Sequence, residues 1–596
     1  MRILSFLLIA IFTTGTAFSS EGEVELESIT VTLEDTIAQE ISTKNVTVIY
    51  DADEPQTSIE DSLDYQAGVD ISRRGMLGIQ SDLSIRGSTY EQVAISANGI
   101  SLNNPQTGHH NFDFGIPSSH IERIEITRGS CPIIWGQGAM GGAVNIVTKK
   151  PLNDEADLSF LYGTDETHKA SAYVSHNNDI IGLNFSAEEA ASNGWRYDTD
   201  FKEFTLGSSA LFKTELISSY FYAGYGEKEF GAADFYGDYD SKEWTNTLFL
   251  NWYTQLEKGP FRIKPKLYYK SHHDKYMLDV NNPDRYINHH KTGIEGIQVE
   301  AEADFERYGL LSIGADSRRE DINSKRLGKD SRNKNSYLLA SRNYKNESFG
   351  YDVSLRVDDY SDYDTGILPQ AGIFFNIAPQ IRLRSNIAKT QRPPTYTELF
   401  YDSPANKGNK NLSSEEAMNY EAGCDISLNK EEKIKARCTF FRRDSKDLID
   451  WIKKSSSDSF YQANNRAEVK TEGVEVELDA YILQWLKLKS TYAYIDSDIK
   501  KEDDYISKYA LNHPDHKVGA SLDFILGFGT QTINFLYKNI KGYSSYLLIG
   551  ADFSYELNKY SNIFVTLDNI FDIKYEDIRD IPLPGREIRV GTRVRF

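Results

Sequence analysis

The stretch Leu547-Leu548-Ile549-Gly550-Ala551-Asp552-Phe553-Ser554-Tyr555-Glu556-Leu557 decides the fold class. Its odd-numbered side chains are all apolar or aromatic, and its even-numbered side chains are small, polar or acidic except for Leu548. A period of two with one apolar face is typical of a β-strand. Asn558-Lys559 then breaks the pattern, and Ile563, Val565 and Leu567 resume it, which predicts a hairpin.

The same alternation recurs from residue 151 to residue 596, in segments of roughly ten residues that no helical pattern interrupts. A strand that crosses a membrane at a tilt needs about that length. Polar stretches at 323–335 and 403–414 indicate long loops, whereas other connections are short turns, a difference typical of outer-membrane barrels. We therefore expect an all-β transmembrane barrel of about 22 antiparallel strands, and roughly sixteen or eighteen strands with longer loops would also fit the length.

The composition excludes several classes of protein. The 596 residues include 66 Lys and Arg against 88 Asp and Glu, a formal net charge of -22, which disfavours a nucleic-acid partner. Mean hydropathy is -0.50, and no stretch after the N-terminus has the 18 or so unbroken apolar residues of a membrane-spanning helix. No nucleophile with a neighbouring base stands out, so we expect no catalytic residues and no enzyme activity.

The N-terminal quarter of the chain differs from the rest. Arg2, the apolar stretch 3–12 and a candidate cleavage site at 17–19 predict a signal peptide over residues 1–19. Residues 20–51 form an acidic linker. Residues 52–150 predict a compact α+β domain, dense in glycine, with short strands at 93–95, 123–126 and 143–147. Within it, Ser58-Ile59-Glu60-Asp61 is typical of a helix start.

The three cysteines are Cys131, Cys424 and Cys438, an odd number for an exported protein. Cys424 and Cys438 flank an expected turn at 430–432 at equal distance, so they could face each other across a hairpin. Either they form a disulfide, or they are two small side chains that face lipid. None of the spacings resembles a zinc site.

Several motifs give the chain a resemblance to a known family. Ser84 to Gly87, Asn98 to Ile100, Ile121 to Gly129 and Trp135 to Thr148 occur in the order and spacing of the plug domain of TonB-dependent outer-membrane receptors. Stretches of the barrel also resemble motifs of that family: Gln391 to Phe400, Gly473 to Glu477, Leu567 to Tyr575, and the terminal Phe596. By length, the chain is most similar to the cobalamin-receptor branch. It departs from the usual pattern in having Asn98-Gly99 for Asp-Gly and Pro393 for Ala.

The resemblance implies a fold and a set of partners. It implies a plug domain over residues 52–150 that is folded inside the lumen of a barrel over residues 151–596, in the outer membrane of a Gram-negative bacterium. The expected partners are membrane lipid, a metal-chelate ligand and TonB, with the protein itself a monomer. The stretch Glu27, Ser28, Ile29, Thr30, Val31 and Thr32 resembles a TonB box, an extended segment that can add as an edge strand to a partner's sheet.

A charge cluster follows from the alternation and the resemblance together. The apolar parity of 420–428 and of 474–480 faces lipid, so Glu421, Asp425, Glu475 and Glu477 face the lumen. The resemblance places plug arginines opposite such glutamates, at the positions of Arg86 and Arg128. We expect a plug–barrel ionic cluster of Arg86, Arg128, Glu421 and Glu475, with separate solvation of these charges in a wet lumen as the alternative.

The resemblance also places ligand contacts at the apices of the plug and in the extracellular loops. The candidates are Ser88, Thr89, Tyr90, Asn103, His109, His110 and Phe112 of the plug, and the aromatic residues Tyr225 and Tyr236 in stretches that we expect to be loops. Two histidine pairs, 272–273 and 289–290, fall in a region that we also expect to be extracellular. Cobalamin receptors use loop aspartates for calcium, which makes Asp198, Asp200, Asp238 and Asp240 candidate ligands for a loop calcium.

The function implied is TonB-dependent active transport of a scarce metal chelate, either cobalamin or a ferric siderophore. No cofactor is required for it. Paired histidines could instead ligate haem iron, which would make the chain a haem receptor of the same family. A surface receptor or adhesin that binds without import is a further alternative, and a passive porin is disfavoured by the plug motifs.

Overall fold

A computed structural model describes residues 43–50, 58–129, 138–235, 237, 239–305, 308–344, 348–428, 433–500, 506–508, 513–540 and 544–596. These residues belong to one compact unit, which spans residues 36–596. The expected signal peptide, the TonB-box residues Glu27 to Thr32, Cys131, Tyr236 and Asp238 lie outside the described residues. No helix in the described part is long and apolar enough to cross a membrane.

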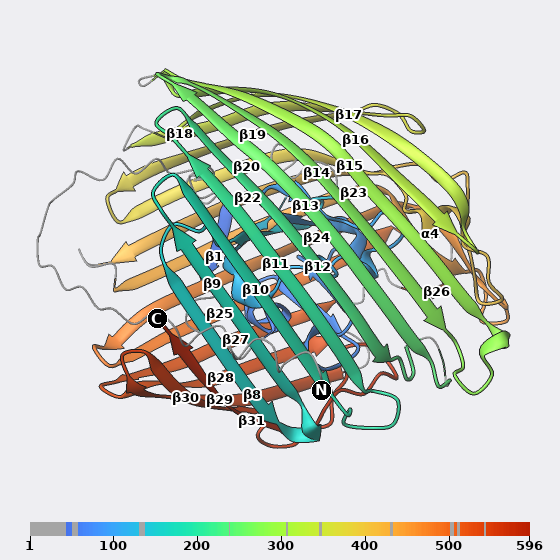
Figure 1. The fold of residues 1–596 in the computed structure, drawn as a ribbon. Helices are drawn as coiled ribbons and strands as arrows, with labels where there is room; N and C mark the ends of the chain where they lie inside the picture. The colour runs from blue at the N-terminus through green and yellow to red at the C-terminus, as the bar shows by residue number, and fades with distance from the viewer. Residues whose placement is uncertain are drawn as a thin grey trace, which may run out of the picture. The chain divides into compact units, whose positions relative to one another are not determined.

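The expected barrel is confirmed as 22 antiparallel strands that close on themselves (Figure 1). The last strand, β31, pairs with the first, β8, and Val590 lies opposite Tyr162. The strands are β8 (Glu155–Gly163), β9 (His168–Asn177), β10 (Ile181–Ser192), β11 (Phe201–Lys213), β12 (Ile217–Gly231), β13 (Lys242–Lys258), β14 (Phe261–Met277), β15 (Ile287–Asp304), β16 (Leu310–Ser324), β17 (Gly328–Asn343), β18 (Phe349–Tyr360), β19 (Gly366–Ala378), β20 (Ile381–Arg392), β22 (Glu415–Leu428), β23 (Ile434–Lys453), β24 (Tyr461–Leu483), β25 (Leu486–Lys500), β27 (Pro514–Leu526), β28 (Gly529–Ile540), β29 (Ser544–Asn558), β30 (Ser561–Asp568) and β31 (Glu587–Arg595). Two short pieces, β21 (Asn406–Lys407) and β26 (Ile506–Ser507), extend the sheet at its edge.

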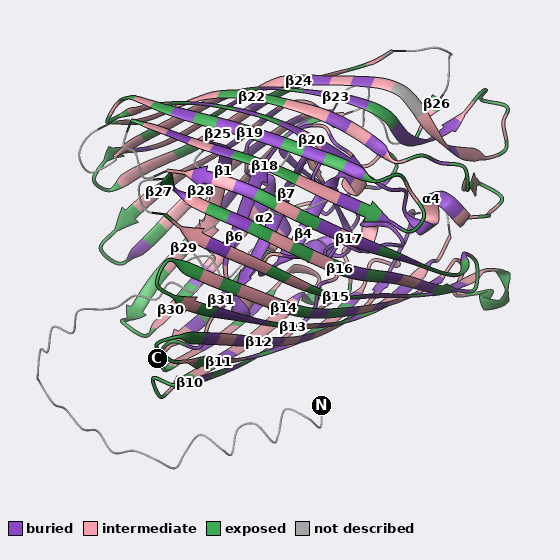
Figure 2. Cartoon of the chain, turned by 90° about the horizontal axis from the view of Figure 1, so that it is seen from above, coloured by how far each residue is buried: buried purple, intermediate pink, exposed green. Residues whose placement is uncertain are grey.

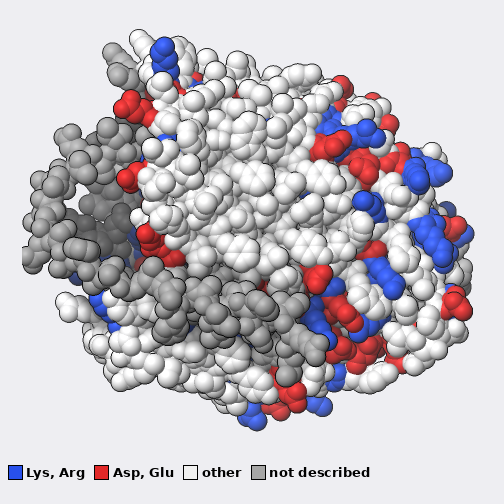
Figure 3. Space-filling model, in the orientation of Figure 1, with Lys and Arg blue, Asp and Glu red and all other residues white. Residues whose placement is uncertain are grey.

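Alternation along each strand separates an outer apolar face from the lumen. In β29 the side chains of Leu547, Phe553 and Tyr555 are exposed, whereas Tyr546 on the opposite parity is buried. Figure 3 shows the result on one side of the barrel: a broad surface without Lys, Arg, Asp or Glu, and charges gathered toward the end where α4 (Tyr396–Phe400) lies. Apolar side chains that point outward in this way match the hydrocarbon layer of a membrane.

Connections at one end of the barrel are short, and the long connections all lie at the other end. The turns 214–216, 259–260, 379–380, 484–485, 527–528 and 559–560 occupy one end, and the connections 193–200, 232–241, 278–286, 393–414 and 569–586 occupy the other. One expected loop is wrong, because 323–335 consists of the ends of β16 and β17, paired from Ser324–Gly328 onward, around a turn at 325–327. Backbone pairing continues into the polar sequence beyond the membrane, which makes several strands longer than the roughly ten residues expected.

The plug is built on a five-stranded sheet in the order β1-β6-β7-β4-β5. These strands are β1 (Asn45–Tyr50), β4 (Val93–Ala97), β5 (Ile100–Ser101), β6 (Ile121–Arg128) and β7 (Gly142–Thr148), and only β4 and β7 run parallel. A separate hairpin joins β2 (Val69–Arg73) to β3 (Ser81–Ile85). Short 3-10 turns occupy 76–78, 90–92, 108–110 and 118–120 in the plug and 164–166 and 283–285 in the barrel.

The short helix predicted in the plug is confirmed as α2 (Ile59–Asp64). Ser58 caps it, accepting from the Asp61 amide, and Asp61 reciprocates at the Ser58 amide. Fully buried Leu63, Ile71, Ile85 and Val144 form the apolar interior of the plug. Figure 2 shows these buried elements inside the ring of strands, whose own residues alternate between buried and exposed.

Candidate functional site

A tight turn after β3 aims Arg86 from the plug at the barrel wall. Arg86 and Gly87 both have positive φ, 53° and 65°, and the Arg86 amide donates to the Gly68 carbonyl at 2.7 Å. Positive φ is unfavourable for arginine, so the turn is held by its surroundings. A side chain at Gly87 would collide with His513 of the wall, which explains why glycine stands there.

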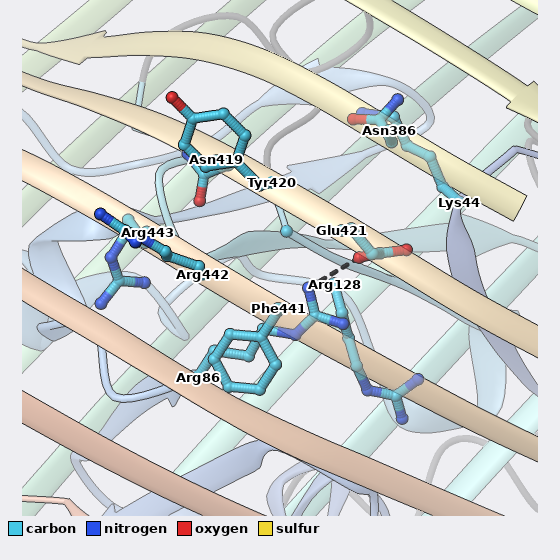
Figure 4. A pocket seen from close by; sticks show the side chains of 11 residues that line it. Lys44, Arg86, Arg128, Asn386, Asn419, Tyr420, Glu421, Phe441, Arg442 and Arg443 are labelled. Atoms are coloured by element: carbon cyan, nitrogen blue, oxygen red, sulfur yellow. Dashed lines mark hydrogen bonds and ion pairs between the residues drawn. The ribbon is translucent and has the colours of Figure 1, made fainter.

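The structure brings Arg86, Glu421 and Glu475 together in the lumen. Arg86 Nε and Nη2 donate to the two oxygens of Glu475 at 2.9 and 2.6 Å, and its Nη1 donates to Glu421 Oε2 at 2.7 Å. The side chains of Arg86, Glu421 and Glu475 are 3%, 7% and 1% exposed. The Phe441 ring lies against the guanidinium, 4.5 Å from its carbon, and Figure 4 shows the pocket they line. Bidentate pairing of this kind fixes orientation as well as charge.

The wall balances this cluster with a charge of its own. Arg384 on β20 pairs with Glu421 and donates to Thr439. Two guanidinium groups therefore share two carboxylates in a buried space. Although burial disfavours its charge, the carboxylates of Glu475 and Glu421 raise the pKa of Arg86 above its usual value.

Arg128, the other expected arginine, contacts Glu477 rather than Glu421 or Glu475. It is fully buried, and its Nη1 lies 2.9 Å from Glu477 Oε1 and donates to Thr47 at 2.9 Å. Its Nε donates to the Ala67 carbonyl at 2.6 Å. Arg128 therefore ties β1 and the chain before β2 to Glu477, the lumen-facing neighbour of Glu475 on β24.

A second plug–barrel cluster was not anticipated. Lys517 and Lys538 lie directly opposite each other on β27 and β28, and both point into the lumen. Asp64 of the plug contacts both, with Lys538 Nζ 3.0 Å from Asp64 Oδ2 and 2.9 Å from Asp70 Oδ1. Burial favours the neutral acid, but the charges of Lys517, Lys538 and Arg73 hold the pKa of Asp64 well below its usual range. Two lysines that face each other on the lumen side of neighbouring strands repel each other unless a carboxylate lies between them. Their shared parity in the sequence could therefore have indicated an acidic partner in the plug.

The face of the plug toward the long connections carries a second group of candidate residues. His109 Nδ1 pairs with Asp82 at 2.7 Å, its Nε2 bonds the Tyr90 hydroxyl at 3.2 Å, and the two rings stack at 4.4 Å. Amides of α4 donate to the carbonyls of Pro105 and Gln106 at 2.9 and 3.1 Å. The plug segment around residue 105 therefore lies directly under the long connection 393–414.

Other predicted contact residues have structural partners. Asn103 bonds the Ile95 amide and the Val93 carbonyl, and Ser88 accepts from the Ile85 amide. Thr89 takes part in a capping box at residues 89–92, and Phe112 is buried. Tyr225 lies on β12 rather than in a loop, with its hydroxyl on Glu227 at 2.9 Å.

His110 lies at the seam between plug and wall rather than at the apex. It is buried, 3.4 Å from Asp113 and 3.5 Å from Asp274 on β14. The histidine pairs 272–273 and 289–290 lie within β14 and β15, near the strand ends that join the long connection 278–286. His272 and His290 are the buried members of the two pairs.

Among the candidate calcium ligands, Asp198 and Asp200 lie on the connection 193–200 and Asp240 on the connection 232–241. Burial and the nearby carboxylates of Asp200 and Asp240 raise the pKa of Asp198 to about 7. Its Oδ2 is buried without a hydrogen-bond partner among the described residues. Cys424 and Cys438 lie directly opposite each other on β22 and β23, as free thiols.

Comparisons with known proteins agree with this architecture. The profile of the family described as TonB dependent receptor-like, beta-barrel matches residues 144–570, and that of the TonB-dependent Receptor Plug Domain matches residues 35–143. The Vitamin B12 transporter BtuB of Photobacterium profundum is 22% identical over 557 residues, which cover 87% of this chain and 86% of that protein. The protein of the same name from Vibrio vulnificus is 21% identical over 570 residues, covering 89% and 88%.

Solved structures show the same fold. The siderophore receptor PirA from Acinetobacter baumannii superposes with a TM-score of 0.77 at 17% identity, covering 94% of this chain and 99% of that one. The ferric-catecholate import receptor Fiu from E. coli superposes with a TM-score of 0.74 at 14% identity, covering 94% and 97%.

Proposed function

Since the chain belongs to the family of TonB-dependent receptors, which lie in the outer membrane of Gram-negative bacteria, we propose that it imports a scarce metal chelate with energy from TonB. The observation that carries the proposal is a plug held in the lumen of a closed barrel by buried ion pairs. Arg86 with Glu475 and Lys538 with Asp64 hold it on two parts of the wall. A passive pore has no use for such a plug, whereas an importer must open it on demand.

We place cobalamin first among the ligands and a ferric siderophore second. The relatives matched along most of their length carry the name vitamin B12 transporter, and the superposed siderophore receptors share the fold alone. A haem receptor is the alternative within the family. It is less favoured because His109 is engaged by Asp82 and Tyr90, and His110 is buried at the seam where a molecule as large as haem does not fit.

The proposed cycle uses the plug as its moving part. A ligand on the outer face contacts Tyr90, His109 and neighbouring side chains at the apex and shifts the equilibrium of the plug. The TonB box at Glu27 to Thr32 then becomes available to add as a strand to TonB, which pulls on the plug. No bond is made or broken in the ligand, so no catalytic residue is required.

Uptake measurements test the proposal. In a strain that lacks its own receptors, this chain should restore accumulation of labelled cobalamin, and ferric enterobactin and haem serve as competing ligands. Ile29→Pro removes an amide that strand addition needs, so it should abolish uptake and leave binding to cells unchanged. Asp35→Pro, outside the box, is the control. Binding without uptake by the unaltered chain would instead identify a surface receptor or adhesin, and no uptake of any chelate would overturn the proposal.

We also propose calcium at the aspartates of the long connections. A buried carboxylate oxygen without a partner at Asp198, close to two further aspartates, suits a hard cation. Calorimetry with Ca²⁺ on the purified protein tests this, with Asp198→Asn as the variant that should lose binding. If Asp198→Asn and the unaltered chain release the same heat of Ca²⁺ binding, the site is rejected.

A further inference from the structure

Two histidines and three carboxylates meet at the seam between the plug and strands β13 and β14. His110 and Asp113 belong to the plug, His272 and Asp274 to β14, and Glu243 to β13. One ligand atom each from His110, Asp113 and His272 lie within 4.8 Å of one another. All five side chains are buried or nearly so. Lys228 Nζ lies 3.2 Å from Asp113 Oδ1, and the nitrogens of the His110 ring lie 3.4–3.7 Å from the three carboxylates.

The distances suit the ligands of one ion better than hydrogen bonds. His110 Nδ1 lies 3.4 Å from Asp113 Oδ2, beyond the usual hydrogen-bond range of about 2.7–3.2 Å. Two ligand atoms that each lie about 2.0–2.1 Å from a tetrahedral zinc ion are about 3.4 Å apart. The pair is therefore spaced as ligands of a shared cation would be.

Hydrogen bonding around His272 leaves one nitrogen lone pair free. The Thr247 hydroxyl donates its one proton to the Asp113 carbonyl at 3.0 Å. It must then accept from His272 Nδ1, which lies 2.9 Å away, so Nδ1 carries the proton of the neutral ring. His272 Nε2 is left as a bare acceptor, buried and without a hydrogen-bond partner among the described residues. A neutral imidazole whose far nitrogen is held by a second residue is the form that binds a metal.

The far side of His110 offers the matching support. With Nδ1 on an ion, the proton of the ring sits on Nε2, which lies 3.5 Å from Asp274 Oδ2 and 3.7 Å from Glu243 Oε1. Both distances exceed direct hydrogen bonding, so Asp274 and Glu243 would support the ring by charge or by a small movement toward Nε2. A small cavity lined by Asp113, Thr247 and Lys228 lies beside the cluster.

We propose that His110, His272 and Asp113 bind one divalent transition-metal ion with a preference for imidazole, such as Zn²⁺, and that the ion links the plug to β14. Two imidazoles and one carboxylate leave the fourth position of a tetrahedral ion open for water. Such an ion would hold the plug segment around residues 108–114 against the wall. The site is separate from chelate import, and it stands whichever ligand the protein carries.

Titration of the purified, detergent-solubilised protein with Zn²⁺ tests the site, and Co²⁺ reports the ligand geometry through its visible absorption. We expect one ion per chain. His272→Gln and His110→Gln each remove a ligand, so each should weaken binding by roughly 100-fold or more, beyond the 10–100-fold cost of losing a second-layer partner. Thr247→Val should weaken it by roughly 10–100-fold, because the Nδ1 proton of His272 loses its acceptor.

His273→Gln is the matched control, since His273 is the next residue on β14 and points to the other face of the strand. It should bind as the unaltered chain does. Heat-resistant migration on a gel verifies that each variant has a folded barrel. Absence of binding by the unaltered chain, or binding that His272→Gln and His110→Gln leave unchanged, overturns the proposal.

Discussion

Replacing Glu475 with glutamine should loosen the plug by a measurable amount. Arg86, 3% exposed, would keep one neighbouring carboxylate, Glu421, which Arg384 already shares. Arg86 and Arg384 would then share one carboxylate in place of two. Leaving a buried charge without its partner costs about 3–5 kcal/mol.

Hydrogen exchange in detergent, read by mass spectrometry on peptides that cover residues 81–88, measures the effect. The Arg86 amide is bonded to the Gly68 carbonyl in the turn that the ion pair holds, so its protection reports the docking of that turn. A loss of about 3–5 kcal/mol corresponds to exchange roughly 100- to 4,000-fold faster. The same variant should expose the plug to protease.

Glu472→Gln provides the control on the same strand. Glu472 is 50% exposed and pairs with Lys470 at the surface, a contact that contributes about 1 kcal/mol or less. Equal exchange rates in Glu475→Gln, Glu472→Gln and the unaltered chain would refute the claim that the cluster holds the plug.

Two further predictions concern the plug. Burial and the Glu398 carboxylate raise the pKa of Glu91 to about 8, with Arg392 opposing and Asp82 adding to the shift. The folded state therefore holds a proton that the unfolded chain loses above its ordinary pKa of 4.5, so this stabilisation is complete below about pH 4.5 and is lost as pH rises through about 8. Thermal unfolding between pH 6 and 9 should show that fall in the unaltered chain and less of it in Glu91→Gln; equal slopes would contradict it. Ser58→Ala removes the cap of α2 and should lower the stability of the helix by about 1 kcal/mol, measured as faster amide hydrogen exchange of residues 59–65. Ser457→Ala, at an exposed site, is the control. Unchanged exchange in Ser58→Ala would show that packing alone holds the helix.

The barrel could be predicted because its signal is local. A strand between lipid and lumen must alternate side chains whatever its neighbours are, so the parity of 547–557 is visible without any knowledge of pairing. The ends of strands carry no such signal. At 323–335 both faces are wet, so polar sequence looks like a loop although the backbone remains paired across Ser324 and Gly328.

The seam between plug and wall was only partly visible in the sequence. Parity identified Glu421, Glu475 and Glu477 as lumen-facing, and the resemblance supplied the arginines. Which arginine meets which glutamate depends on the docking of the plug, and Arg128 contacts Glu477 rather than Glu475 for that reason. The contacts of Lys517 and Lys538 with Asp64 join residues more than four hundred positions apart, a separation at which no local pattern indicates a partner.

The chemistry of that seam differs from the chemistry of the plug interior, and the difference bears on how the plug can move. Inside the plug, Leu63, Ile71 and Val144 are fully buried, so opening the plug itself exposes apolar surface to water. At the seam, ion pairs such as Arg86 with Glu475 lie alongside local apolar contacts such as Met76 with Phe201. Buried ion pairs contribute little net stability because desolvation offsets their attraction, but they strongly oppose any misplaced partner. A plug docked through such pairs is fixed in orientation, but it is weakly held once water reaches the seam. A plug domain that TonB displaces and that must dock again requires both properties.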